Sequence, residues 1–93
     1  MGNCYEDFKE ALDKTIMSSD IVKIKAKMSG LSFEFYQYVS EIYEEDNNLV
    51  VSFEDDSTMI FDYGAVSFRE QETYGKVCYV IEGSDIYVEV TVM

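Results

Sequence analysis

The sequence of 93 residues contains no histidine, no tryptophan and no proline, and only seven of its residues are basic. Without histidine, the chain lacks the usual general base near neutral pH, the commonest metal-binding side chain and the middle member of a hydrolytic triad. Nineteen acidic residues give a formal net charge of −12. This charge argues against direct binding of nucleic acid, because two polyanions repel each other. These absences favour a binding protein over an enzyme.

Cysteines and long apolar runs are also scarce. The two cysteines, Cys4 and Cys78, form no CxxC motif, so we expect no disulfide framework, and Cys78, inside the apolar segment Val77–Ile81, is predicted to be a buried thiol. The first residues show neither the basic segment nor the apolar segment of a signal peptide, so none is expected. No segment approaches the roughly 18 apolar residues of a membrane span. We therefore expect a cytoplasmic protein that has no membrane contact, no cofactor and no metal site.

What is present is enough to fold. Hydrophobic residues make up 47% of the chain and aromatic residues 15%, which suits a single acidic α+β domain over residues 1–93. Near the start, apolar residues recur at spacings of three and four, and Asn3 is a suitable N-cap. This pattern predicts one helix over about residues 3–18, with an apolar face formed by Tyr5, Phe8, Leu12 and Ile16.

Strand patterns follow from about residue 21 to residue 93. In Ile21–Met28, apolar residues alternate with three lysines, as on a strand with one buried face. Residues 31–44 fit both a strand and a helical face, and their aromatic composition favours a long strand whose alternation slips near Tyr36, as a β-bulge would cause. The prediction is a helix packed on an antiparallel β-meander of five to six strands.

The negative charge is unevenly distributed. Residues 1–27 contain five acids and five lysines, so their net charge is zero, whereas residues 28–93 contain fourteen acids against Arg69 and Lys76 alone. Two runs of three acids stand out, and exposed tyrosines near them could stack on arginine side chains of a partner. The predicted partner-binding residues are Glu44, Glu45, Asp46, Glu54, Asp55, Asp56, Asp62, Tyr36, Tyr38, Tyr43 and Tyr63.

An acidic sheet could present carboxylates about 6.6 Å apart along a strand, a spacing comparable with that of phosphates on nucleic acid. In size, charge and lack of catalytic residues, the chain is similar to the small acidic anti-CRISPR and anti-restriction proteins of phages, although no family motif runs along it. The resemblance implies an inhibitor that binds a basic nuclease or other nucleic-acid-binding effector and blocks its groove. The alternatives are a toxin-immunity protein, or a generic binding domain whose acids only keep it soluble.

Two further segments have predicted roles. The lysines at positions 23, 25 and 27 are expected to form the solvated face of one strand, paired with acids of its neighbour, or to guard against edge-to-edge aggregation. The C-terminal strand, which alternates apolar and polar residues up to Val92, is a candidate for an unpaired sheet edge. An edge of this kind would allow a homodimer to form by sheet extension.

Overall fold

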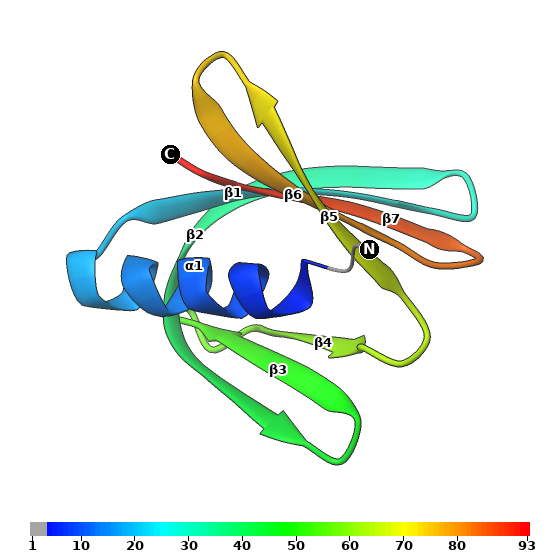
Figure 1. Ribbon diagram of the computed structural model, residues 1–93, viewed down its shortest axis with the longest axis horizontal. Helices are drawn as coiled ribbons and strands as arrows, with labels where there is room; N and C mark the ends of the chain where they lie inside the picture. Colours follow the sequence, from blue (N-terminus) through cyan, green and yellow to red (C-terminus); the bar gives the residue numbers. More distant parts are fainter. Residues whose placement is uncertain (1–3) are drawn as a thin grey trace.

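The computed structural model describes residues 4–93, which form one helix and a seven-stranded antiparallel sheet (Figure 1). The α+β class with an N-terminal helix is confirmed, but the prediction of five to six strands is wrong. The polar segment Ser67–Thr73 has a weak strand pattern, yet it pairs along its whole length with the following strand. The elements are α1 (Tyr5–Ser18), β1 (Ile21–Met28), β2 (Leu31–Glu45), β3 (Asn48–Phe53), β4 (Thr58–Asp62), β5 (Ser67–Thr73), β6 (Lys76–Glu82) and β7 (Ile86–Val92).

The strand order is β4-β3-β2-β1-β7-β6-β5, so the sheet is two meanders joined by the pairing of β1 with β7. The last strand therefore lies in the middle of the sheet, hydrogen-bonded to β1 on one side and to β6 on the other. The prediction that it forms a free edge for a homodimer is wrong, because alternation shows which face is buried and not how many neighbours a strand has. The two edges are β4 and β5.

The ambiguous segment is a strand, β2, of 15 residues. Its register shifts between Val39 and Glu41, where β2 begins to pair with β3, and not near Tyr36 as predicted. Before the shift, Phe35 lies opposite the buried Ile24 of β1; after it, Ile42 lies opposite the buried Val51 of β3. The shift lets one long strand turn its apolar residues toward α1 in both halves.

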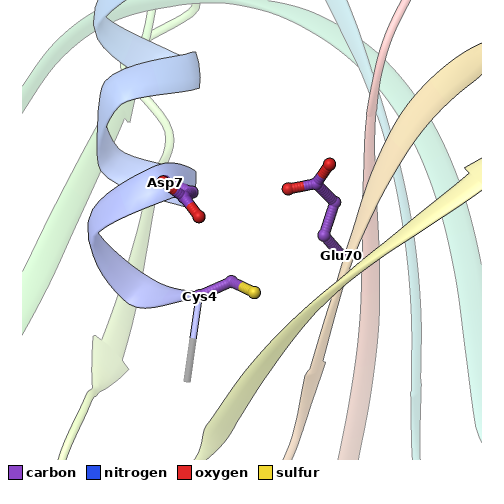
Figure 2. A group of neighbouring side chains, drawn as sticks. All are labelled: Cys4, Asp7 and Glu70. Atoms are coloured by element: carbon purple, nitrogen blue, oxygen red, sulfur yellow. The ribbon is translucent and has the colours of Figure 1, made fainter. Parts of the chain in front are cut away.

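The helix α1 begins at Tyr5, with Cys4 as its N-cap, and ends at Ser18, followed by the C-cap Ser19 in a left-handed conformation. The predicted cap, Asn3, lies outside the described residues. Three of the four residues of the predicted face are buried, and Ile16 is half-buried. Figure 2 shows Cys4 at the start of α1, facing Glu70 of β5. No helix in residues 4–93 combines the length and apolar character needed to cross a membrane.

Aromatic side chains close the gap between the two edges of the sheet. The sheet curls around α1, with β3 and β4 on one side of the helix and β1, β6 and β7 on the other (Figure 1). Phe8 of α1 is 1% exposed, and its ring centroid lies 5.9 Å from that of Phe61 on β4 and 5.5 Å from that of Phe68 on β5. Phe61 and Phe68 are themselves 6.3 Å apart. Packing across these three rings therefore joins strands that share no hydrogen-bonded ladder.

Candidate interaction surface

The seven predicted acids and Tyr43 lie on one part of the fold, the second half of β2 with β3 and β4, which we call the β2–β4 arm (residues 39–62). The other predicted tyrosines, Tyr36, Tyr38 and Tyr63, lie just outside it. The two acidic runs occupy opposite ends of this arm. Glu45 and Asp46 lie at the turn between β2 and β3, and Glu54 and Asp56 lie at the turn between β3 and β4. With six residues in β3, the two turns are about 20 Å apart. All seven predicted acids are exposed, but they do not form one compact cluster.

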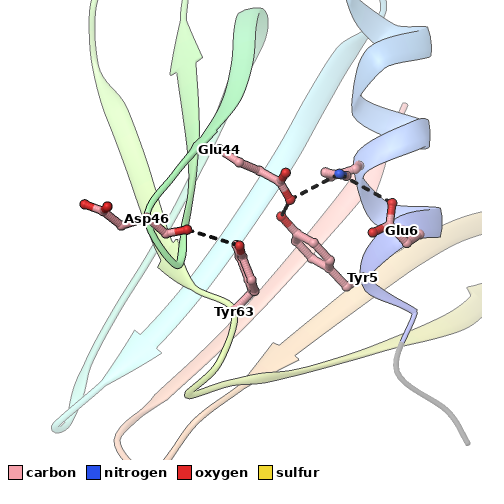
Figure 3. A network of polar contacts seen from close by, with 6 residues as sticks. Tyr5, Glu6, Glu44, Asp46 and Tyr63 are labelled. Carbon is pink, nitrogen blue, oxygen red and sulfur yellow. Dashed lines mark hydrogen bonds and ion pairs between the residues drawn. The ribbon is translucent and has the colours of Figure 1, made fainter.

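Glu44 faces the helix and is part of the fold's internal contacts. It lies opposite the fully buried Leu49, and it accepts a hydrogen bond of 2.5 Å from the Tyr5 hydroxyl group (Figure 3). Its Oε2 atom also lies 3.1 Å from Nζ of Lys9. The bond from Tyr5, followed by that from Lys9, lowers the pKa of Glu44, while burial and the Glu44 carboxylate raise the pKa of Tyr5. Glu44 therefore fastens α1 to β2.

Two more of the predicted acids stabilise turns. Asp55 accepts hydrogen bonds from the backbone N–H and the hydroxyl group of Ser57, and these bonds lower its pKa. Its other oxygen accepts a bond of 2.7 Å from Gln37. Asp62 accepts the backbone N–H of Gly64 at 3.0 Å. Of the seven predicted acids, four have side chains that make no hydrogen bond or ion pair within residues 4–93: Glu45, Asp46, Glu54 and Asp56.

Three of the four predicted tyrosines line one face. Tyr36, Tyr38 and Tyr43 are exposed on the side of β2 that points away from α1, which we call the outer face. The register shift keeps them on the same face, although Tyr38 and Tyr43 are an odd number of residues apart. Tyr63 is different: its ring stacks on Tyr5 at 4.7 Å, and its hydroxyl group donates to the carbonyl of Asp46 (Figure 3).

Two residues of this surface are absent from the sequence-based prediction. Glu41 lies between Tyr38 and Tyr43 on the outer face, and Ile60 on β4 is 64% exposed. Ile60 pairs with Val50, and Val50 pairs with Tyr43, so these three side chains cross the arm in one row. Alternation could have identified Ile60, because its neighbours Met59 and Phe61 both pack against the core. The face of β2 on which Glu41 lies can be predicted only when the position of the bulge is known.

The three lysines of β1 lie on the outer face beside this surface. Lys23 forms an ion pair of 3.3 Å with Glu34 of β2, which raises the pKa of Lys23, and Lys25 lies between Glu34 and Glu89 of the two neighbouring strands. The predicted pairing of this row with acids of its neighbour is thus confirmed at Lys23. Two acids, Glu34 and Glu89, thus offset part of the charge of this row. Residues 28–68, which include the β2–β4 arm, contain no basic residue.

The outer face of the arm combines an apolar centre with separated carboxylates. Glu41, Tyr43 and Glu45 alternate along β2, so its carboxylates recur about every 13 Å and not every 6.6 Å. This spacing does not copy a row of phosphates. The arrangement suits contact with a protein surface in which arginine side chains can pair with the acids and stack on the tyrosines.

Comparison of the chain with protein-family models, with curated proteins and with solved structures gave no match. Functional inference therefore depends on the fold and on the chemistry of its exposed side chains.

Proposed function

We propose that the protein is a non-enzymatic acidic binding protein that inhibits a basic nucleic-acid-binding protein, such as a nuclease, in the manner of anti-CRISPR or anti-restriction proteins. Uncompensated charge is the observation that supports this proposal. Within residues 4–93, ion pairs reach only three of the fourteen acids found in residues 28–93. These three are Glu34, Glu44 and Glu82.

A charged surface that only keeps a protein soluble has no use for exposed apolar side chains at its centre. On the outer face of the arm, Tyr43 of β2 and Ile60 of β4 flank Val50 of β3. Acids lie in the turns at both ends of β3. Tyrosine is enriched among the residues that contribute most to protein–protein binding, and such residues lie near the centre of an interface. This pattern favours a protein partner over simple solvation.

The electrostatic field of the arm supports a basic partner. Opposite charges speed the encounter of two proteins, and salt screens this effect, with a Debye length of about 8 Å at physiological ionic strength. A basic groove that normally holds nucleic acid offers both the positive charge and the arginine side chains that such a surface can engage. Mimicry here concerns charge and not the spacing of phosphates.

Competition for nucleic acid tests the proposal. Each of a panel of purified nucleases and other basic nucleic-acid-binding proteins is loaded with fluorescent DNA or RNA, and displacement by the protein is measured at rising salt. The arm variant changes Glu41, Glu45 and Glu54 to Gln, since none of the three stabilises the fold through an ion pair or side-chain hydrogen bond within residues 4–93. The control variant removes the same charge elsewhere, through Glu10→Gln, Glu72→Gln and Asp85→Asn, all exposed positions.

We expect displacement that weakens with salt and that is about 3- to 150-fold weaker for the arm variant, from about 0.2–1 kcal/mol for each exposed charge pair. The control should stay close to the unmodified protein. If both variants lost displacement equally, the acids would act only through the net charge of the protein, and the proposal would be contradicted. Tight, salt-resistant inhibition of one enzyme alone would instead favour a toxin-immunity role for the same surface.

A further inference from the structure

Three metal-binding side chains meet where the start of α1 passes β5. Cys4 precedes the helix, Asp7 lies in its first turn and Glu70 belongs to β5. The Cys4 sulfur and one carboxylate oxygen from each acid all lie within 4.8 Å of one another, and the three side chains point into the same space (Figure 2). The Cys4 side chain makes no capping hydrogen bond. Within residues 4–93, neither Asp7 nor Glu70 forms an ion pair or a side-chain hydrogen bond.

The backbone holds both halves of this cluster in place. Cys4 and Asp7 are three residues apart, so their side chains lie on one side of the first helical turn. The backbone N–H of Cys4 donates a hydrogen bond of 3.0 Å to the carbonyl of Phe68, which fastens the start of the helix to β5. Phe68 and Glu70 are two residues apart on one strand and therefore share a face of the sheet.

A buried tyrosine adds a polar group to the same space. Tyr79 of β6 is 6% exposed and lies directly opposite Glu70 in the β5–β6 pairing. It lines a hollow of about 310 Å³ together with Asp7, Glu10 and Glu70. Its hydroxyl group makes no hydrogen bond to any described residue, and its oxygen atom is not itself enclosed, so it can bond to a ligand or to water in the hollow. Burial, followed by the nearby charges of Glu70 and Asp7, raises the pKa of Tyr79.

The balance of charge around the hollow favours a cation. Three acids line it, and Lys14 is the basic residue among its lining side chains. No ion pair joins Lys14 to these acids within residues 4–93. Carboxylates held this close repel one another, and a bound cation would relieve that repulsion.

We propose that Cys4, Asp7 and Glu70 bind a divalent cation, and that zinc is the ion their chemistry fits best. Magnesium and calcium prefer oxygen ligands alone, whereas zinc accepts a thiolate together with carboxylates. Ligand atoms of one tetrahedral zinc ion lie about 3.5 Å apart, so atoms within 4.8 Å reach this geometry after side-chain movements of about 1 Å. A water molecule completes the coordination, and the Tyr79 hydroxyl group donates to it or to a bound carboxylate.

Zinc binding would tie α1 to an edge strand of the sheet. The Cys4 thiol must lose its proton to bind, so each zinc ion taken up releases one proton to the buffer. Because the ligands come from the helix start and from β5, the ion would stabilise the folded chain and not the unfolded one. This inference is independent of the proposed function, since its residues lie outside the β2–β4 arm.

The test titrates the full chain with zinc chloride in a calorimeter and follows thermal unfolding in parallel. We expect one ion per chain, and a rise in the unfolding midpoint of about 11–22 °C at a free zinc concentration a hundredfold above the dissociation constant. Glu70→Gln should weaken binding at least about tenfold. The control is Glu72→Gln, the same change two residues further along the same strand, which should bind zinc like the unmodified protein.

The thiol ligand has a readout of its own. Cobalt should give the absorption of a thiolate–metal bond, which Cys4→Ser should abolish. In the folded protein, iodoacetamide should react with Cys4, since Cys78 is 3% exposed, and saturating zinc should slow that reaction at least about tenfold. This second assay needs no variant. The proposal is overturned if zinc neither binds nor protects Cys4, if both glutamate variants lose binding equally, or if bound cobalt lacks the thiolate absorption.

Discussion

Replacing Phe8 by alanine should cost this protein a large part of its stability, because one ring touches both edges of the sheet. Phe8 is 1% exposed and contacts Phe61 of β4, Phe68 of β5 and Tyr79 of β6, with ring centroids 5.5–5.9 Å away. Truncation of a buried phenylalanine typically costs about 3–5 kcal/mol, and each lost aromatic pair adds to the loss. We therefore expect the upper part of this range.

The free energy lost in Phe8→Ala is a large fraction of the total free energy of unfolding. A domain of 93 residues has a free energy of unfolding of about 5–14 kcal/mol, at about 0.05–0.15 kcal/mol per residue. At about 4–8 °C for each kcal/mol, the midpoint of thermal unfolding should fall by about 15–40 °C. Urea unfolding followed by circular dichroism measures the change, and Phe8→Leu provides a milder variant, expected to cost about 1–2 kcal/mol, if the alanine variant does not fold.

The matched control lies on the same helix. Met17 is 88% exposed, so Met17→Ala should change the free energy of unfolding by less than about 0.5 kcal/mol. A loss below about 1 kcal/mol for Phe8→Ala would refute the argument that α1 and its aromatic contacts join β4 to β5. A loss of the expected size, together with faster amide hydrogen exchange in both edge strands, would support it.

Two further predictions follow from the surface and from Tyr5. Ile60 is 64% exposed, so Ile60→Ser should leave the free energy of unfolding within about 0.5 kcal/mol of the unmodified value. The same variant should displace nucleic acid more weakly in the competition assay. Unchanged displacement would show that Ile60 is not part of the interface. Because the pKa of Tyr5 is raised in the folded protein, stability should persist up to about pH 10 and fall above it, where the unfolded chain loses a proton that the folded one keeps. In urea titrations between about pH 10 and 12, Tyr5→Phe should flatten this fall by up to about 1.4 kcal/mol per pH unit, and an equally steep fall would contradict the raised pKa.

The sequence predicted those parts of the fold that depend on local periodicity. The helix and β1 follow from regular spacing of apolar residues, and both form over nearly the predicted ranges. The position of the bulge in β2 did not follow, because tyrosines at 36, 38 and 43 and a mixture of polar residues allow the alternation to shift at several points. The neighbours of β7 could not be read from its own residues, since pairing depends on how the whole chain folds back on itself.

The candidate surface was predicted by residue type but not by orientation. Glu44 and Glu45 are adjacent in sequence, yet only Glu45 points outward, because neighbouring strand residues face opposite sides. Tyr63 follows β4 directly and stacks on Tyr5, a contact between residues 58 positions apart that no local pattern signals. The side chains of Asp55 and Asp62 accept hydrogen bonds from the backbone N–H groups two residues further on, as aspartates in turns commonly do.

Exposed apolar side chains, and not the acids, distinguish an interaction surface on the arm from protection of sheet edges. Exposed edges attract other strands, and charged side chains on an edge strand discourage such pairing. The edge strand β5 fits that role, with Arg69, Glu70 and Glu72 along it. Glu41 and Glu45 lie on the second half of β2, which pairs with β3 alone, and their charge can protect its open side in the same way. Edge protection does not account for the exposed side chains of Tyr43 and Ile60, which add apolar surface to the same face, whereas a partner that binds the outer face does.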